Sequence, residues 1–175
     1  MIYVVRHGET EWNAIDKVLG RSDIPLDAKG VEQARELASA MKGLEIDEIL
    51  TSPLSRARQT AEFIAAETGA PCRVDERLIE QDFGRFEGID RFDPEYQAAK
   101  REYFVRYPGG ESYFDMAARV FPLIKEVEAS GRNVVLATHG GICRIIRNYY
   151  EDMSNEDFVM FSQGNCELRK YPPEE

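Results

Sequence analysis

The N-terminal stretch MIYVVRHGETEWN, residues 1–13, places a short apolar run directly before arginine, histidine and glycine. Met1–Val5 is rich in β-branched residues and has no helical period, which predicts a buried strand. The same arrangement recurs at Asn133–Thr138, NVVLAT, which is followed by histidine and two glycines. Two apolar strands that each end in a histidine and a glycine are therefore the starting point for the rest of the fold.

Helical patterns alternate with these strands. A helix is predicted between Asp27 and Gly43, because Val31, Ala34, Leu37, Ala38 and Met41 recur on one face. Ser55–Thr68 predicts a second helix, which stops at Gly69. Ser112–Ala129 predicts a third, in which Pro122 should cause a kink or a break. A fourth follows His139, since apolar residues recur there with helical spacing (Ile142, Ile145, Ile146 and Tyr149).

Three more short strands are predicted, at Ile46–Thr51, Cys72–Val74 and Cys166–Tyr171. Because strands and helices alternate, we predict an α/β fold, a three-layer α/β/α sandwich with a mainly parallel sheet. The length of 175 residues suits a single domain over residues 1–175. Residues 80–112, aromatic and charged, predict an insertion with one or two amphipathic helices, resembling a lid. The tail Pro172–Glu175 should be frayed.

The composition excludes several classes of protein. The 22 Lys and Arg against 32 Asp and Glu give a net charge of −10, which disfavours nucleic-acid binding. No apolar run approaches the ~20 residues of a membrane span, and Arg6 and His7 interrupt any secretory signal. The three cysteines form no CxxC pair, which suits a reducing compartment. We expect a cytoplasmic protein with no nucleic-acid or membrane partner; its oligomeric state stays open.

The only two histidines of the chain, His7 and His139, both lie where a predicted strand ends. Ligands bind at the carboxyl ends of strands in open parallel sheets. The chain has no HExxH pair for a metal, no GxSxG elbow, no Walker A motif and no GxGxxG loop. We therefore expect no metal and no cofactor, and favour a histidine that attacks phosphorus. Arg6 and Arg56 are the candidate guanidiniums for binding the phosphoryl dianion.

The segment Arg6–Asn13, RHGETEWN, resembles the signature of the histidine phosphatase superfamily, in its phosphoglycerate mutase-like branch. Further segments resemble its motifs in the same order: Gly20–Leu26, Ser52–Thr60, Leu78–Gly88, Thr138–Gly141 and, more weakly, Gly109–Ser112 with Arg119 downstream. Together these matches span residues 1–141. Any one of them could arise by chance, but the ordered set is specific.

The resemblance implies a phosphoglycerate mutase-like fold and a role for each matching residue. His7 would become phosphohistidine, and Arg6, Arg56 and His139 would bind the phosphoryl oxygens. Glu80 would be the general acid and then the base. Asn13 and the backbone of Gly140 would assist in binding the phosphoryl oxygens. Apart from the resemblance, Gly20 and Arg21, which lie together in a loop, are candidates for contact with the substrate. His139 would act best when protonated and His7 when neutral.

Two departures from the family pattern bear on the activity. Mutases of the family carry arginine directly after the catalytic glutamate, where this chain has Gln81, and they carry a long basic insertion that is absent here. The aromatic residue of the WEG element is Phe86. We therefore predict hydrolysis of small phosphorylated metabolites through a phosphohistidine, resembling small phosphatases such as the alpha-ribazole phosphatases.

Other activities and substrates stay open at this point. Mutase-type phosphoryl transfer and a non-catalytic module that binds a phosphorylated ligand are the alternatives. Fructose-2,6-bisphosphatase-like and broad-specificity enzymes share the same motifs. The aromatic residues of 103–113, with Lys100, Arg101 and Arg106, could form a lid that selects the alcohol part of the substrate.

Overall fold

The computed structural model describes residues 1–172, in which five strands form one sheet in the order β3-β2-β4-β1-β5. The strands are β1 (Ile2–Arg6), β2 (Glu48–Thr51), β3 (Cys72–Val74), β4 (Val134–Thr138) and β5 (Leu168–Tyr171). All pairings are parallel except that of β5, which runs antiparallel to β1. The predicted mainly parallel sheet is confirmed. Strand β5 begins later than predicted because Cys166 has a φ of 54°, in the left-handed region that a strand excludes.

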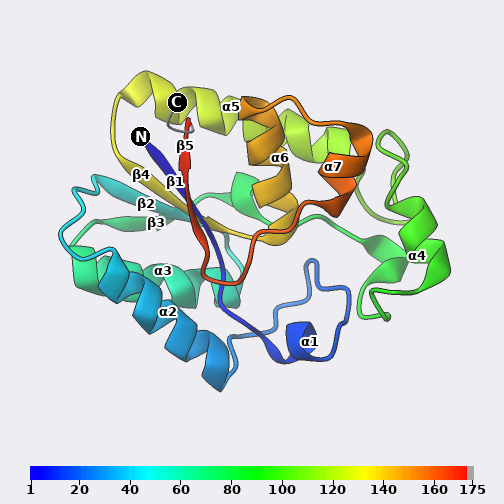
Figure 1. The fold of residues 1–175 in the computed structure, drawn as a ribbon, viewed down its shortest axis with the longest axis horizontal. Helices are drawn as coiled ribbons and strands as arrows, with labels where there is room; N and C mark the ends of the chain where they lie inside the picture. The colour runs from blue at the N-terminus through cyan, green and yellow to red at the C-terminus, as the bar shows by residue number, and fades with distance from the viewer. Residues whose placement is uncertain (173–175) are drawn as a thin grey trace.

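Helices cover both faces of this sheet (Figure 1). On one face lie α2 (Ala28–Ala40) and α3 (Ser55–Thr68), and on the other lie α5 (Tyr113–Ser130) and α6 (Gly140–Tyr150). Successive side chains of a strand point to opposite faces. Tyr3 and Val5 accordingly pack in the core beneath α2 and α3, whereas Ile2 and Val4 pack in the core beneath α5 and α6. The three-layer sandwich is confirmed.

Helix α5 runs without a break through Pro122. Of the two outcomes predicted at this residue the break is therefore wrong, and the kink stays a prediction. A proline inside a helix removes one hydrogen bond, to the carbonyl four residues earlier. That carbonyl belongs to Ala118, and both Ala118 and Pro122 lie on the exposed side of α5. Water can therefore satisfy the free carbonyl, and the helix continues.

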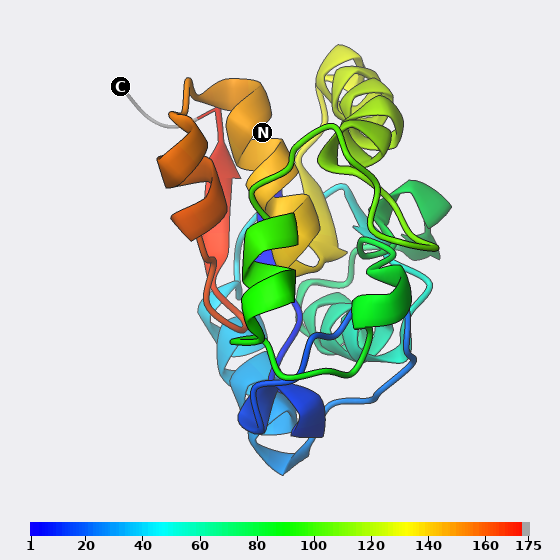
Figure 2. The same ribbon diagram turned by 90° about the vertical axis from the view of Figure 1, so that its right-hand side faces the viewer.

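Residues 80–112 leave the sheet and pack on themselves. They contain the 3-10 helix η2 (Gly84–Phe86) and the helix α4 (Pro94–Ala99), and the 3-10 helix η1 (Glu76–Leu78) directly precedes them. Their aromatic side chains form a separate small core with Val18 of the first loop (Phe83, Phe86, Tyr96 and Tyr107). Figure 2 shows this green segment standing in front of α6. Residues 80–112 are thus attached, through their contact with Val18, to the loop that follows β1.

Two short helices were not predicted, α1 (Glu11–Ala14) and α7 (Asn155–Met160). Each is capped by a hydroxyl side chain, from Thr10 and Ser154 respectively, but is too short to show a helical period. Among residues 1–172 no helix is long and apolar enough to cross a membrane. The predicted fraying of the tail concerns residues 173–175, which lie outside the described residues.

Candidate active site

The sheet register brings the two histidines together. Strands β1 and β4 pair in parallel with Arg6 opposite Thr138, and the His7 amide donates to the Thr138 carbonyl at 2.9 Å. Each histidine is the next residue after its strand, so both imidazoles leave the same edge of the sheet. Their ring centroids lie 5.1 Å apart. The prediction that these two residues share one site is therefore consistent with the geometry.

His7 is held as one tautomer. Its Nδ1 lies 2.7 Å from the Gly8 carbonyl oxygen, which can only accept, so Nδ1 carries the proton. The other nitrogen, Nε2, accepts a hydrogen bond from Nε of Arg56 at 3.3 Å. Burial lowers the pKa of His7 well below its ordinary value, and the charges of Arg56 and Arg6 lower it further. The buried ring is therefore neutral, with its lone pair on Nε2.

Arg56 reaches His7 from the first turn of α3 and is completely buried. Its two terminal nitrogens donate to the carbonyls of Ser22 at 2.9 Å and Gly20 at 2.6 Å. The loop after β1 thus fixes the guanidinium against Nε2 of His7. Gly20 does not line the pocket, and its amide donates to Glu87 at 2.9 Å, so its contact with substrate stays a prediction.

His139 lies behind His7 and is also fully buried. Its Nε2 is 2.7 Å from the hydroxyl oxygen of Ser52, and its Nδ1 has no partner among the described residues. Burial lowers its pKa well below the ordinary value, followed by the charge of Arg56. Without a bound anion a neutral His139 is favoured, because a third buried cation beside two guanidiniums is unfavourable. That His139 acts protonated when a phosphoryl dianion is bound stays a prediction.

Glu80 approaches the N-terminus of α6. One carboxylate oxygen accepts from the Gly141 amide at 3.0 Å and the other from the Gln81 amide at 2.8 Å. The approach requires glycine at 141, since a Cβ there would lie 2.5 Å from a Glu80 carboxylate oxygen. In the sequence HGG, residues 139–141, the histidine therefore follows the end of β4, and the second glycine allows Glu80 to approach.

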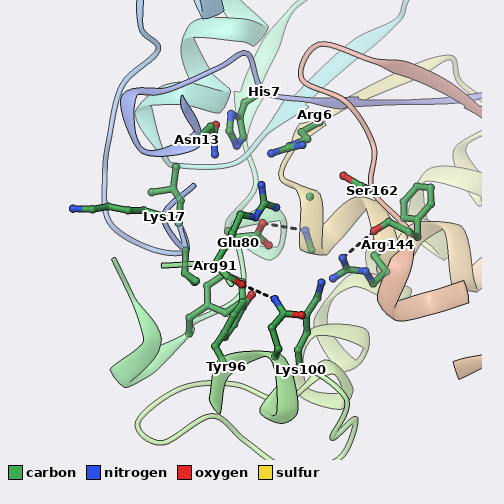
Figure 3. Close-up of a pocket in the computed structure, with 17 residues that line it drawn as sticks. Arg6, His7, Asn13, Lys17, Glu80, Arg91, Tyr96, Lys100, Arg144 and Ser162 are labelled. Carbon is green, nitrogen blue, oxygen red and sulfur yellow. Dashed lines mark hydrogen bonds between the residues drawn. The ribbon is translucent and has the colours of Figure 1, made fainter. Parts of the chain in front are cut away.

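One pocket opens over these groups (Figure 3), and its inner wall contains Arg6, His7, Asn13, Glu80 and Gly140. Arg6 donates to the Gln163 carbonyl at 2.7 Å, while its buried Nε has no partner among the described residues. Arg56 and His139 are absent from this wall and lie behind His7. Five predicted site residues thus line the pocket, and two more, Arg56 and His139, are buried behind His7.

The outer part of the pocket is basic. Arg91, Lys100 and Arg144 line it, from the segment before α4, the end of α4 and helix α6. Burial lowers the pKa of Lys100 to about 8, and the charges of Arg144 and Arg91 add to this effect. No carboxylate of the described residues forms an ion pair with Lys100 or Arg144. Sequence reasoning named Lys100 as a lid residue but missed Arg91 and Arg144, because the three residues come from separate elements.

Arg21 does not line the pocket, and its contact with substrate stays a prediction. Its guanidinium forms ion pairs with Glu111 at 3.0 Å and Asp82 at 3.6 Å. Gln81 is also turned away, since its side-chain amide donates to the Glu111 carbonyl at 3.2 Å. The loop of Arg21 and the segment after Glu80 therefore hold each other rather than the substrate.

The predicted lid residues divide in the structure. Lys100 lines the pocket, but Arg101 pairs with Glu156 and Arg106 pairs with Asp115. Tyr103 and Tyr113 pack on each other, with ring centroids 5.8 Å apart. Of this group only Lys100 faces the place where substrate would lie. Among residues 1–172 no group of three or more His, Cys, Asp or Glu could hold a metal ion.

The mainly parallel five-stranded sheet between two layers of helices is a phosphoglycerate mutase-like fold, and it presents two histidines at neighbouring strand ends, with arginines and a glutamate around them. The chain belongs to the histidine phosphatase superfamily (branch 1), whose family model matches residues 2–175. A probable phosphoglycerate mutase GpmB of Salmonella choleraesuis (strain SC-B67) is 37% identical over 148 residues, which are 79% of this chain and 69% of that protein.

Solved structures give the same assignment. A mycobacterial glucosyl-3-phosphoglycerate phosphatase is 30% identical with a TM-score of 0.84, over 95% of this chain and 87% of that one. TTHB049 from Thermus thermophilus is 37% identical with a TM-score of 0.71, over 85% of this chain and 84% of that one. Membership of the family supports a phosphatase or a mutase activity and leaves the substrate open.

Proposed function

We propose that this chain is a metal-independent phosphatase that hydrolyses small phosphomonoesters through a phosphohistidine at His7. The observation that carries the proposal is the hydrogen bond from Nδ1 of His7 to the Gly8 carbonyl, at 2.7 Å. This bond leaves the lone pair on Nε2, beside the buried guanidinium of Arg56. A neutral imidazole with a fixed tautomer is a competent nucleophile toward phosphorus.

The reaction has two steps. In the first, Nε2 of His7 forms a bond to phosphorus while the bond from phosphorus to the ester oxygen breaks, and Glu80 donates a proton to the leaving alkoxide. In the second, water attacks phosphorus, Glu80 takes a proton from that water, and the phosphorus–nitrogen bond breaks. Phosphate leaves, and His7 returns to its neutral form with the proton still on Nδ1.

Positive charge around the phosphoryl group supplies most of the catalysis, because charge in a loose transition state lies on the phosphoryl oxygens. Arg6 offers its unpartnered Nε from the pocket wall. Arg56 exchanges its hydrogen bond to Nε2 for contacts with the phosphoryl oxygens when Nε2 bonds to phosphorus. His139 donates from Nδ1 when the Ser52 hydroxyl donates to its Nε2.

The basic outer pocket points to the substrate class. Arg91, Lys100 and Arg144 gather about one cavity in a chain of net charge −10. Arg91 is exposed and pairs with Asp16 at 3.3 Å, whereas Lys100 and Arg144 pair with no carboxylate of the described residues. Two cations that are partly buried together are unfavourable unless an anion joins them. We therefore assign to the substrate a second anionic group, such as a carboxylate, on the alcohol side of the ester. Phosphoglycerate derivatives, which appear in the names of two of the similar proteins, carry both a phosphate ester and a carboxylate.

A mutase is the second candidate, favoured by the similarity to a protein named as a probable phosphoglycerate mutase. A mutase must return the phosphoryl group to a hydroxyl of the bound substrate before water intervenes. Two observations argue against a mutase. Gln81 occupies the position where the mutases carry arginine, and its side-chain amide donates to the carbonyl of Glu111. Conversion of 3-phosphoglycerate to 2-phosphoglycerate without release of phosphate would establish the mutase instead.

Phosphate release from p-nitrophenyl phosphate and from a panel of phosphorylated metabolites, alpha-ribazole phosphate and 3-phosphoglycerate included, tests the proposal. We expect turnover with a chelator present, a phosphorylated protein after acid-free quenching, and loss of both in His7→Ala. Turnover that survives unchanged in His7→Ala contradicts the phosphohistidine. Binding of phosphate with no hydrolysis across the panel would instead indicate a non-catalytic binding module.

A further inference from the structure

The position of Glu80 does not come from regular secondary structure. Residues 79–83 belong to no helix or strand, although the carboxylate of Glu80 must meet the leaving group inside the pocket. Its backbone carbonyl accepts from two side chains, Arg21 and Arg119, each at 3.4 Å. The peptide that carries the proposed acid is therefore held by arginines that lie outside the pocket.

Arg119 spans this segment from helix α5. It donates to the carbonyl of Arg77 at 2.5 Å as well as to that of Glu80. Both nitrogens on its other edge donate to the carboxylate of Glu111, at 3.3 and 3.2 Å. A planar guanidinium bound on both edges has little freedom to rotate. Arg119 thus ties the end of η1 and Glu80 to α5.

Glu111 lies at the centre of the cluster. Its carboxylate binds Arg119, pairs with Arg21 at 3.0 Å and accepts from the Asp82 amide at 3.1 Å. Its backbone amide donates to the Asp82 carbonyl at 2.9 Å, and its carbonyl accepts from the Gln81 side chain. The side chains of Glu111 and Arg119 are each only 18% exposed, so solvent screens the pair weakly.

We infer that Arg119, Glu111 and Arg21 form a positioning cluster, which holds the peptide of Glu80 so that its carboxylate can protonate the leaving group. None of the three lines the pocket, and their charged groups are bound to the backbone of residues 77–82 or to one another, so we assign them a positioning role and no contact with the substrate. Catalysis by a proton donor depends on its position to a fraction of an ångström. The inference rests on the proposed function, because it presumes the acid role of Glu80.

The test compares two kinds of phosphate ester in Arg119→Lys and Glu111→Gln. An aryl ester such as p-nitrophenyl phosphate leaves without a proton, whereas an alkyl ester such as glycerol phosphate requires one. We expect kcat for the alkyl ester to fall about tenfold or more and kcat for the aryl ester to fall less than about threefold, with KM little changed. In a Glu80→Gln background, Arg119→Lys should cause no further loss on the alkyl ester.

Arg106→Gln is the matched control. It removes another arginine–carboxylate pair, with Asp115 at the start of α5, without any contact to residues 80–82. Equal losses on both esters in Arg119→Lys and Glu111→Gln, or losses that add to those of Glu80→Gln, would overturn the inference. If Arg119→Lys does not fold, Glu111→Gln and Arg21→Lys carry the same comparison.

The results that would refute the proposed function differ from those that would refute the positioning cluster alone. A wild-type protein that hydrolyses neither ester refutes the function, and the cluster then has no acid to position. A wild-type protein whose Glu80→Gln variant loses both esters equally refutes the acid role, and the inference falls with it. Only a Glu80→Gln variant that is selective for the aryl ester, beside unselective cluster variants, refutes the inference alone.

Discussion

The backbone amide of Gly141 donates to the carboxylate of Glu80 over 3.0 Å, although 61 residues separate them in sequence. This hydrogen bond joins the start of α6, which follows β4, to the irregular segment after η1. The amide of a helix N-terminus is a donor that no intrahelical bond satisfies. It therefore gives this oxygen of Glu80 a fixed place in the pocket that His7 also lines.

Substitution of Gly141 should displace Glu80. An alanine Cβ at 141 would lie 2.5 Å from a carboxylate oxygen of Glu80, whereas one at Gly140 would meet nothing closer than Nε of Arg6 at 3.6 Å. We expect Gly141→Ala to lower kcat for an alkyl phosphate by about a hundredfold, and Gly140→Ala to cause a much smaller loss. Steady-state rates of the two variants decide this. A Gly140→Ala loss as large as that of Gly141→Ala would contradict the steric argument.

Removal of the Arg56 guanidinium should cost stability as well as activity. Arg56→Met deletes the donors to the Gly20 and Ser22 carbonyls and to His7, in a fully buried place. Buried acceptors without partners destabilise by about 1–3 kcal/mol each, so we expect a loss of about 2–5 kcal/mol. Urea unfolding measures it. Arg58→Met, on the exposed side of the same helix, should stay within about 0.5 kcal/mol of wild type.

The two buried histidines should make the fold sensitive to mild acid. Their pKa values in the folded protein lie well below the ordinary value, mainly because of burial and then because of Arg56. The unfolded chain takes up these protons near pH ~6.5, so the unfolded state binds more protons below that pH. Stability should therefore fall as the pH drops below ~6.5, by about 1.4 kcal/mol per pH unit for each histidine.

The measurement is urea unfolding of wild type and His139→Gln at several pH values. The slope of the free energy of unfolding against pH, from about pH 6.5 to about pH 5, should be smaller in the variant by about 1.4 kcal/mol per pH unit. Above pH ~7.5 the two slopes should coincide, because histidine is neutral in both states there. Parallel slopes in the acid range would show that His139 is protonated in the folded protein.

The basic outer pocket should select substrates with a second negative charge. Lys100→Met should raise KM for 3-phosphoglycerate about tenfold and leave KM for p-nitrophenyl phosphate nearly unchanged, because only the former reaches Lys100. Arg101→Met, one residue on, is the control, since Arg101 is exposed and pairs with Glu156. An equal rise of KM for both substrates in Lys100→Met would argue against the second anionic group.

The same lysine predicts a pH effect. The pKa of Lys100 is lowered to about 8, so its charge is present below that pH and is lost as the pH rises through it. We therefore expect KM for 3-phosphoglycerate to increase between about pH 7 and about pH 9 in wild type. In Lys100→Met the increase should disappear. A wild-type KM that stays flat over this range would mean that Lys100 makes no contact with the substrate.

Local patterns predicted much of the fold. Helix α3 and strand β3 have the predicted bounds, because periodicity and turn residues act within a few positions of the chain. Helices α1 and α7 were missed because four and six residues are too few to show a period. The predicted break at Pro122 was wrong because the local sequence does not show that the carbonyl of Ala118 lies on the exposed side of the helix.

The sequence by itself determined the two apolar strands, the histidine and glycine that end each of them, and the order of the family motifs. The tertiary structure decided which side chains meet. It turned Arg21 toward Glu111, whereas it brought Arg91, Lys100 and Arg144 to one cavity. All four are basic residues in loops or helices, and the sequence around them does not show this difference. The reason is physical: secondary structure follows from neighbouring residues, whereas the neighbours of a charge depend on how distant segments pack.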